Sequence, residues 1–442
     1  MEATLQEILD SREKRAKTQK ELLEKYQKPL VCFTMNIPGP VKMDRDIAIG
    51  FAMGERLLKN AVQQQLVFSA AQTPNTGAEG FYVVDMDAKQ LKKLVLEIEE
   101  IDPIGRLFDM DVIDITGKKV SREDVGYPRR KCLLCDEDAV VCASRRTHSL
   151  EKLRHTTGFL LYITARKWMC EYIGTWAYYA LTQELSTTPK PGLVDRNNAG
   201  AHKDMTPRHF FASADALRPF FNRFAEQGFL TRDSAATETF SVIRSLGKEA
   251  EQAMLQATGG VNTHKGAIFS LGILCAAAGR LGPEGWNMEA LLTEAAAMTQ
   301  GLVETDFAGI TVETAKTAGE RLFANYGVTG VRGQAEAGFP AVRNIGMPMF
   351  QKALQDGQSL NNAGCIALLH MLAAVEDTNL IHRGGMETAQ TMQQKVAAIL
   401  EAEPYPARET LLELDKAFIE KNLSPGGTAD LLAIVYFLHY LK

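Results

Sequence analysis

The sequence predicts two domains: an amino-terminal α/β or α+β domain with a mixed sheet, followed by an all-α domain. The chain has 442 residues, roughly two to three times the length of a typical single domain. Strand-like runs alternate with amphipathic segments up to about residue 155, and Ala-, Leu- and Met-rich helical windows follow them. We therefore expect the domains at residues 1–155 and 156–442.

In the first domain, apolar residues recur at helical spacing in three segments, with extended apolar runs between them. Helices are expected at residues 2–27, 45–62 and 88–100, and strands at residues 30–35, 66–69, 80–85 and 106–115. Because strands and helices alternate, we expect a mixed sheet. Two prolines and a glycine make residues 36–42 a rigid loop. Asn36 and Lys42 at its ends could line a nucleotide cleft, and a tight surface turn is the alternative.

The second domain is predicted to be helical throughout. Helical windows are expected at residues 159–185, 212–226, 267–279, 288–299, 365–375, 386–402 and 430–441. Four polar, glycine-containing loops lie at residues 190–205, 259–266, 376–385 and 424–430. Since functional residues concentrate on loops held by a rigid scaffold, we expect the chemistry of this domain there.

Composition and charge exclude several classes of protein. Hydrophobic residues make up 45% and charged residues 23%, which excludes a disordered chain or a coiled coil. The net charge of −5 indicates no nucleic-acid partner by bulk charge. The apolar runs are too short to cross a membrane, and the first twenty or so residues lack a signal-peptide core. Seven cysteines, an odd number, do not describe a disulfide framework, so we expect a cytoplasmic protein.

Two predicted strands end in Asp-x-Asp, first at Asp85 and Asp87, then at Asp109 and Asp111. Side chains two apart on a strand share a face, so each pair presents two carboxylates together. Carboxylates bind the divalent metals that bridge phosphates. Arg106 lies close enough to the second pair to hold a phosphate oxygen. Each pair could equally mark the turn that ends a strand.

A cysteine cluster follows the second Asp-x-Asp pair. Cys132, Cys135, Cys142 and His148 are residue types that bind zinc, but Cys142 and His148 are not a regular ligand pair. Free thiols are the alternative. The basic residues around the cluster indicate either a docking surface for an acidic partner or a solvated face.

The four loops of the second domain offer carboxylate, amide, imidazole and glycine groups at helix ends. A glycine-rich loop before a helix binds phosphate, because free N–H groups and the helix dipole face the anion. The candidate residues are Lys190, Asp195, His202, Gly260, Asn262, His264, Lys265, Glu376, Asp377, Asn379 and Asp430. Each alone fits a turn or a structural role, but together they predict a metal-and-phosphate site on a helical scaffold.

Four motifs identify the second domain by resemblance. Lys-Pro-Gly-x-Val-Asp, Gly-Val-Asn-Thr-His-Lys-Gly, Glu-Asp-Thr-Asn and Pro-Gly-Gly-x-Ala-Asp begin at Lys190, Gly260, Glu376 and Pro425. With them the domain resembles the triphosphoribosyl-dephospho-CoA synthase family.

The first domain resembles the phosphoribosyl-dephospho-CoA transferase family, the nucleotidyltransferase-like holo-[acyl-carrier-protein] synthases of citrate lyase. The resemblance lies in residues 33–42, 105–112 and 130–135. The whole chain therefore resembles a bifunctional fusion of the two enzymes.

The resemblance implies two consecutive reactions. The second domain would join the 2′-hydroxyl of 3′-dephospho-CoA to the ribose of ATP and release adenine. The first domain would transfer phosphoribosyl-dephospho-CoA to a serine of the citrate lyase acyl carrier protein and release pyrophosphate. The implied substrates are ATP and 3′-dephospho-CoA, the implied metal is Mg²⁺, and the implied partner is that carrier protein.

The chemistry of these two reactions leads to a hypothesis about residue roles. In the first domain, Asp109 and Asp111 would hold magnesium and Arg106 would hold phosphate oxygens, with Asp85 and Asp87 in reserve. In the second, magnesium binding and base duty would be divided among Asp195, Glu376, Asp377 and Asp430. Nucleotide binding is expected from Asn36, Lys42, Lys190, Gly260, Asn262, His264, Lys265 and Asn379, with His202 as the alternative acid or base.

Three other functions fit parts of the pattern. The same two reactions could serve the malonate decarboxylase carrier protein. A magnesium-dependent N-glycosidase acting on ADP-ribose-type compounds would release its base without dephospho-CoA. A non-catalytic regulator would bind nucleotide and carrier protein without turnover.

Overall fold

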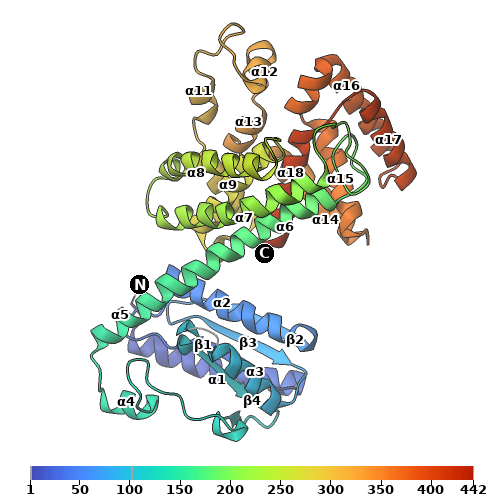
Figure 1. Ribbon diagram of the computed structural model, residues 1–442. Helices are drawn as coiled ribbons and strands as arrows, with labels where there is room; N and C mark the ends of the chain where they lie inside the picture. Colours follow the sequence, from blue (N-terminus) through green and yellow to red (C-terminus); the bar gives the residue numbers. More distant parts are fainter. Residues whose placement is uncertain (1, 101–102, 442) are drawn as a thin grey trace. The chain divides into compact units, whose positions relative to one another are not determined.

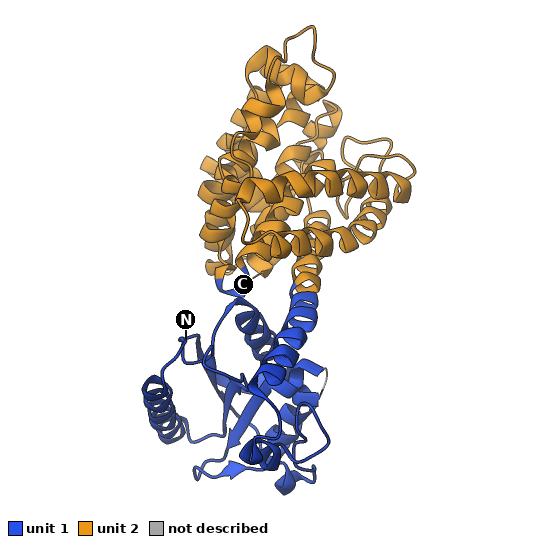
Figure 2. Ribbon diagram, turned by 90° about the vertical axis from the view of Figure 1, so that its left-hand side faces the viewer, with its two compact units in different colours: residues 1–169, 282–284 blue, residues 170–281, 285–442 orange. Residues whose placement is uncertain are grey.

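The computed structural model describes residues 2–100 and 103–441. Its chain divides into two compact units, which are described separately (Figure 2). Unit 1 comprises residues 1–169 with 282–284, and unit 2 comprises residues 170–281 with 285–442.

The chain leaves unit 1 through a continuous helical run (Figure 1). This run consists of α5 (Leu150–Leu160), the π-helical turn η4 (Leu161–Ala165) and α6 (Arg166–Ser186). The expected junction at residues 155/156 falls inside α5, because the run contains no proline to stop the helix.

Unit 1 contains a five-stranded sheet with the strand order β2-β3-β1-β4-β5. The strands are β1 (Leu30–Met35), β2 (Leu66–Gln72), β3 (Glu79–Val84), β4 (Phe108–Ile113) and β5 (Lys119–Val120). Every neighbouring pair is antiparallel, so the expectation of a mixed sheet was wrong. The physical reason is that β3 and β4 run in the same direction but lie on either side of β1, and hence share no ladder.

Helices cover both faces of this sheet. They are α1 (Leu5–Tyr26), α2 (Arg45–Ala61) and α3 (Ala88–Glu100). Leu22 and Leu23 of α1 pack on one face in a cluster with Cys32. On the other face Phe33 of β1 stacks on Phe51 of α2, with ring centroids 4.7 Å apart. Burial on both faces makes β1 almost continuously apolar, as its sequence shows.

Unit 2 is helical, and its described residues contain no strand (Figure 1). After α6 come α7 (Pro207–Leu230), α8 (Ala236–Ala257), α9 (Lys265–Leu281), α10 (Met288–Met298), α11 (Leu302–Phe307), α12 (Ala318–Tyr326), α13 (Gly330–Glu336), α14 (Met347–Gln355), α15 (Leu360–Ala374), α16 (Thr378–Ala402), α17 (Arg408–Glu420) and α18 (Gly426–Tyr440). Helix α9 is apolar on all sides and is buried among α7, α8, α10 and α18. The expectation of an all-α second domain is confirmed.

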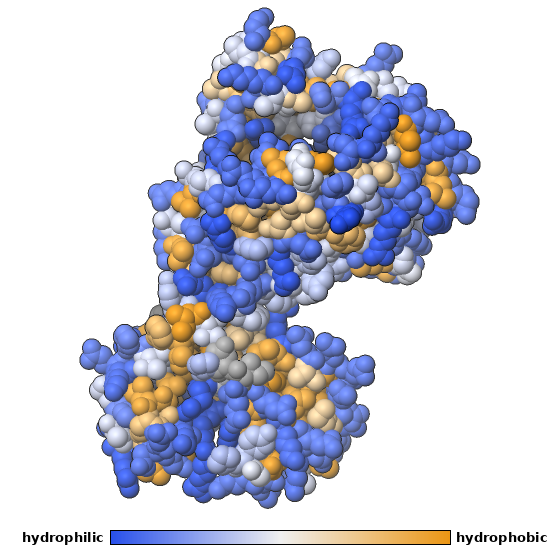
Figure 3. All heavy atoms as spheres, in the orientation of Figure 1, coloured by the Kyte–Doolittle hydropathy of each residue, from blue (hydrophilic) through white to orange (hydrophobic). Residues whose placement is uncertain are grey.

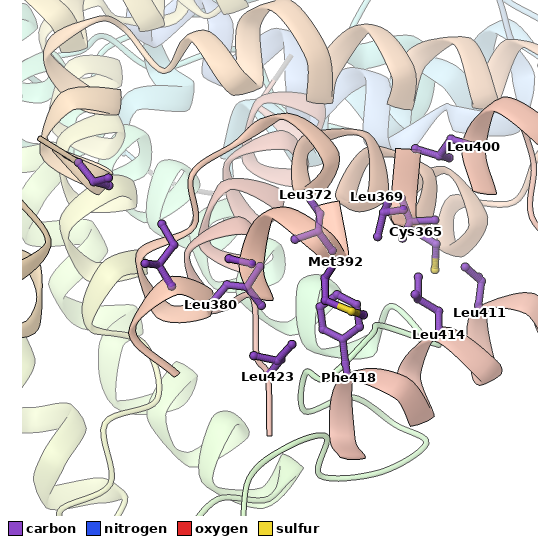
Figure 4. Packing of buried hydrophobic residues seen from close by; sticks show 14 of the residues in the cluster. Cys365, Leu369, Leu372, Leu380, Met392, Leu400, Leu411, Leu414, Phe418 and Leu423 are labelled. Atoms are coloured by element: carbon purple, nitrogen blue, oxygen red, sulfur yellow. The ribbon is translucent and has the colours of Figure 1, made fainter. Parts of the chain in front are cut away.

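A second apolar core joins α15, α16 and α17 (Figure 4). Leu372, Leu380, Met392 and Phe418 are all buried in it. Burial of each such side chain contributes about 1.5–3 kcal/mol to the stability of the fold. Because Leu380 lies in the first turn of α16, this core holds the start of that helix in place.

The face of the molecule in Figure 3 is mostly hydrophilic, with apolar side chains in small groups. Among the described residues, no single helix is long and apolar enough to cross a membrane. Helices α15 and α16 pass that test only as a pair bent by 51°.

Candidate active sites

Unit 2 contains a cleft of about 1250 Å³, and all four predicted loops contribute to its lining. Helices α9, α16 and α18 all begin at this cleft, where Lys265, Asp377 and Gly426 line it. The amino terminus of a helix carries partial positive charge and free N–H groups, which attract anions. The fold thus brings together residues far apart in sequence into one anion-attracting cleft.

Asp377 ties two of these helix ends together. It caps α16, with its Oδ1 accepting from the backbone N–H groups of Asn379 (2.9 Å) and Leu380 (3.0 Å). Its Oδ2 accepts from the backbone N–H of Thr428 (2.6 Å) and from the Thr428 hydroxyl (2.8 Å). Burial raises the pKa of Asp377, against the effect of these donors. With four donors on its two oxygens, this carboxylate is saturated.

Asp430 approaches the first turn of α9. A Cβ at Gly266 would lie 2.0 Å from Asp430 Oδ2, so only glycine permits this approach. Burial, together with the negative charges of Glu184 and Asp377, holds the pKa of Asp430 well above its usual range. The cleft therefore brings acidic groups close together at the helix ends, which favours the protonated form of Asp430.

His264 and Thr263 present buried polar atoms at the cleft. His264 Nδ1 lies 2.7 Å from Ser213 Oγ, and its Nε2 has no hydrogen-bond partner among the described residues. Thr263 Oγ1 is likewise buried without a partner in this part of the chain. Burial, and then the charge of Lys190, lowers the pKa of His264 to about 3. The imidazole is therefore neutral, and its free nitrogen can hydrogen-bond a ligand.

His202 has both ring nitrogens engaged. An Arg383 N–H donates to Nδ1 (3.0 Å), so the proton resides on Nε2, which donates to Ser424 Oγ (2.8 Å). Burial, and then the charge of Arg383, lowers the pKa of His202. His202 thus fixes Arg383 and Ser424 at the cleft, which differs from the expected role as acid or base.

Lys190 and Asp195 do not line the cleft. The buried Lys190 ammonium pairs with Glu184. Asp195 accepts from the backbone N–H groups of Lys190 (2.9 Å), Asn197 (2.6 Å) and Asn198 (3.1 Å). Both residues therefore shape the loop that leads to His202. This placement differs from the expected phosphate contact of Lys190 and the expected magnesium binding by Asp195.

The remaining predicted residues of unit 2 lie at or beside the cleft. Glu376 and Asn379 are exposed on its lining. Asn262 Oδ1 accepts from the N–H of Lys265 (3.3 Å), and the Lys265 ammonium pairs with Glu251 (2.5 Å). Gly260 is absent from the lining, but its φ of 94° requires glycine.

The cleft also has a basic wall that the sequence did not predict, formed by residues of α8, α11 and α13. Asp306 of α11 pairs with both Arg244 of α8 (2.8 Å) and Arg332 of α13 (2.7 Å). All three residues line the cleft together with the exposed Lys248. These cations lie at ordinary surface positions of helices, so no local motif distinguishes them.

In unit 1, Asp109 and Asp111 lie on the same face of β4, as predicted. Cross-strand pairing places them beside Thr34 and Cys32 of β1. Asp111 pairs with Lys119 (2.5 Å). Burial, and then the charge of Asp111, raises the pKa of Asp109.

Charged side chains complete the free edge of β4 next to these aspartates. Glu99 accepts from the N–H of Met110 (2.9 Å), and Lys92 donates to the Met110 carbonyl (3.0 Å). Arg130 donates to the Phe108 carbonyl (2.8 Å) and pairs with Glu99 (2.6 Å). These bonds satisfy edge groups that β5 is too short to reach. These bonds hold Arg130 near Asp109. The residues next to Arg130 in the sequence did not predict this position.

Arg106 and the reserve aspartates have structural partners. Arg106 was expected in the strand 106–115 but lies before β4, in the 3-10 turn η2 (Pro103–Leu107). It donates to the carbonyls of Lys131 (2.6 Å) and Cys132 (2.8 Å). Asp87 caps α3, and Asp85 forms an exposed ion pair with Lys28. The bonds of Arg106 therefore direct its guanidinium to the cysteine segment.

Lys42 closes its own loop. Its ammonium donates to the Ile37 carbonyl (2.6 Å), and burial lowers its pKa. Asn36 is exposed directly after β1, with its N–H on the Leu107 carbonyl (2.7 Å). Asn36 is thus available to a ligand near the start of β4.

Comparison with known proteins assigns each unit to a family. Residues 170–442 match the ATP:dephospho-CoA triphosphoribosyl transferase family, and residues 3–161 match the apo-citrate lyase phosphoribosyl-dephospho-CoA transferase family. The chain belongs to both families. It is a fusion of the triphosphoribosyl transferase and the phosphoribosyl-dephospho-CoA transferase, as the resemblance implied.

Curated relatives share this fused organisation. Protein CitXG of Haemophilus influenzae is 37% identical and covers 99% of this chain and 96% of its own length. Protein CitXG of Leuconostoc mesenteroides is 35% identical, and the match covers 98% of this chain and 96% of that protein's length. The 2-(5''-triphosphoribosyl)-3'-dephosphocoenzyme-A synthase of Pectobacterium atrosepticum is 42% identical over 59% of this chain and 86% of its own.

These matches establish a bifunctional transferase that makes and attaches the citrate lyase prosthetic group. The transferase descriptions favour it over a glycosidase or a binding protein. The citrate lyase description favours it over the malonate decarboxylase alternative.

Proposed function

We propose that the cleft of unit 2 joins the 2′-hydroxyl of 3′-dephospho-CoA to C1′ of the ATP ribose. The bond between C1′ and adenine breaks, the hydroxyl loses its proton, and adenine leaves with a proton. The supporting observation is the cleft itself, which combines three helix amino termini, a basic wall and carboxylates in about 1250 Å³. Pockets for one small ligand measure roughly 300–1000 Å³, so this cleft has room for two nucleotide substrates.

Two kinds of positive group in the cleft match the triphosphate of ATP. The amino termini of α9 and α18 supply N–H groups, and the basic wall supplies Arg244, Lys248 and Arg332. Asp306 holds the two arginines in place by its ion pairs at 2.8 and 2.7 Å. Preorganised cations of this kind bind phosphate without further ordering of side chains.

The carboxylates of the cleft fit magnesium in a restricted way. Asp377 already accepts four hydrogen bonds. The lining carboxylates Glu184, Glu251 and Asp306 are paired with cations. Glu376 and Asp430 are therefore the carboxylates left to hold the ion. Magnesium in nucleotide sites takes one or two carboxylates together with substrate phosphates, so this donor set suffices. When bound, the ion would neutralise charge on a triphosphate that must stay intact.

Breaking the bond to adenine develops positive charge on the ribose, as in glycoside cleavage. The carboxyl groups of Asp430, Asp377 and Glu184 lie near one another here, and in their ionised form they would stabilise that positive charge. The unpartnered Nε2 of the neutral His264 would hydrogen-bond a reacting group of the substrate. His202 and Asp195 would act as positioning residues for the loops around them.

We propose that the face of β4 in unit 1 carries the second transfer. A serine hydroxyl of the citrate lyase acyl carrier protein attacks the phosphorus next to the ribose, loses its proton and displaces pyrophosphate. Asp109 and Asp111 share a face and would hold magnesium, which would neutralise the pyrophosphate. Arg130, fixed by Glu99, would hold a phosphate oxygen in place of the expected Arg106.

The first test is adenine release by the full chain with ATP, magnesium and 3′-dephospho-CoA. Adenine in the complete mixture alone supports the proposal, and equal adenine without the acceptor would favour the glycosidase. Glu376→Gln and Asp430→Asn should each raise the magnesium concentration for half-maximal rate by about tenfold or more. Glu387→Gln, an exposed α16 variant outside the cleft, is the matched control. Unchanged magnesium dependence in both cleft variants would refute the metal assignment.

We also propose that the enzyme acts in the cytoplasm. All seven cysteines are free, as expected in a reducing compartment. Fractionation of cells, followed by detection of the chain in the soluble and membrane fractions, tests this location.

A further inference from the structure

The segment that follows β5 in unit 1 has almost no apolar core. Between residues 121 and 150, the only buried side chains are those of Cys132 and Cys142. Before α5 begins at Leu150, this stretch contains one 3-10 turn (Glu123–Val125) and one short α-helix, α4 (Ala139–Arg145). Segments that bury so little apolar surface generally need a cross-link or a metal to hold one conformation.

The four zinc-type residues of this segment converge in space. One ligand atom each from Cys132, Cys135, Cys142 and His148 lies within 4.8 Å of all the others. His148 Nε2 is 3.2 Å from Cys135 Sγ. Ligand atoms around a tetrahedral zinc ion stand about 3.5–3.8 Å apart, given zinc bonds of about 2.0–2.3 Å. The cluster is therefore close to the dimensions of a zinc site.

The backbone brings these ligands together from three places. Lys131 and Asp138 pair as a narrow antiparallel bridge, with the N–H of Cys132 on the Glu137 carbonyl (2.7 Å), so Cys132 and Cys135 lie in its tight turn. The N–H of Leu134 points at Cys132 Sγ (3.5 Å), a contact that favours a thiolate.

Helix α4 supplies the third thiol, Cys142. Asp138 caps the helix through the N–H groups of Val140 (2.7 Å) and Val141 (3.3 Å). Arg146, directly after the helix, adopts a left-handed conformation with φ 51°, and the chain reverses there and carries His148 back to the thiols.

We propose that Cys132, Cys135, Cys142 and His148 bind one structural Zn²⁺ ion. Three thiolates and one imidazole are soft and intermediate ligands that select zinc over magnesium or calcium. Four protein ligands close the tetrahedron and leave no position for substrate, so the ion orders the fold and does no chemistry. Binding releases the protons of the three thiols.

The zinc site would position Arg130 for the carrier-protein reaction. Arg106 bonds the carbonyls of Lys131 and Cys132, which joins the cluster to η2 directly before β4. Arg130 lies two residues before Cys132 and is held by Glu99 (2.6 Å). Loss of zinc should therefore lower labelling of the carrier protein and leave adenine release unchanged. This activity effect rests on the proposed transfer site on β4, whereas the metal content does not.

The test begins with metal analysis of the full chain purified without chelators under reducing conditions. We expect about one zinc per chain, and uptake of Co²⁺ by the stripped protein with the visible absorption of a tetrahedral thiolate complex. Cys135→Ser should lose the metal and expose residues 127–149 to protease. His148→Asn should bind zinc at least about tenfold more weakly. His155→Asn, a change at an exposed histidine of α5, should retain the metal.

Several results would overturn the proposal. These are a chain that contains no zinc and takes up neither zinc nor cobalt, a disulfide among the three thiols in the freshly reduced protein, and full zinc affinity in His148→Asn. The His148 variant decides the matter even if Cys135→Ser fails to fold, because it keeps all three thiols. Zinc loss with normal labelling would leave the metal site standing and refute the placement of Arg130 in the transfer.

Discussion

Asp377→Asn should destabilise unit 2 at the junction of α16 and α18. The carboxylate accepts two backbone N–H groups of α16 on one oxygen, and the Thr428 N–H (2.6 Å) and hydroxyl (2.8 Å) on the other. An asparagine has a single acceptor oxygen. If that oxygen caps α16, the NH₂ group of the asparagine faces Thr428. The Thr428 hydroxyl can rotate and accept a hydrogen bond from it, but the buried backbone N–H of Thr428 is left without an acceptor.

The loss can be estimated from these bonds. One buried N–H without an acceptor costs about 1–3 kcal/mol, and each remaining bond loses the strength given by the ionised acceptor. We expect the free energy of unfolding to fall by about 3 kcal/mol, which corresponds to a melting temperature lower by about 6–12 °C for a unit of this size. Adenine release should fall with it, because the loop of Thr428 lines the cleft through its neighbours.

Calorimetry measures this effect in the unit 2 transition, and the effect of the control, which lies in unit 1, in the unit 1 transition. Asp44→Asn is the matched control, since Asp44 caps α2 through a single bond to the Ile47 N–H (2.8 Å) and asparagine caps equally well. The control should change the free energy of unfolding by less than about 0.5 kcal/mol. A change of that small size in Asp377→Asn would refute the reasoning.

Three other predictions concern charge. Burial lowers the pKa of His264 from its ordinary value of 6.5, which holds in the unfolded chain, to about 3 in the folded protein. The contribution of this group to stability is therefore full above pH 6.5 and is lost as the pH falls below it. Between pH 7.5 and 5 the wild type should lose about 2 kcal/mol more than His264→Asn, by urea unfolding, and parallel curves would contradict this. Arg332→Ala should raise the KM for ATP about tenfold, with kcat less affected in steady-state assays. Asp109→Ala should stop labelling of the carrier protein, measured with supplied intermediate, but should not affect adenine release. Asp85→Ala should preserve both activities. Normal labelling by Asp109→Ala would refute the metal site on β4.

The sequence by itself determined the division into a strand-containing part and a helical part. Hydrophobic periodicity is a local signal, so it located α1, α2, α3 and the long apolar helices of unit 2. The sequence motifs also indicated the family of the second domain, because four of them, the first at Lys190 to Asp195, resemble those of one family and occur in the same order. The motifs could not separate residues that touch substrate from residues that shape a loop. Asp195 and Lys190 have partners close in sequence, whereas His202 bonds the distant Arg383 and Ser424.

Only the tertiary structure decided which charges lie together. Arg332 and Arg244 reach one cleft because α8 and α13 both pack beside α9, and nothing in their local sequence encodes that neighbourhood. Strand order likewise depends on long-range pairing, which made the sheet antiparallel although helix α3 separates β3 from β4. The convergence of Cys142 and His148 with Cys132 has the same origin, since the reversal after α4 turns an irregular spacing into a compact cluster.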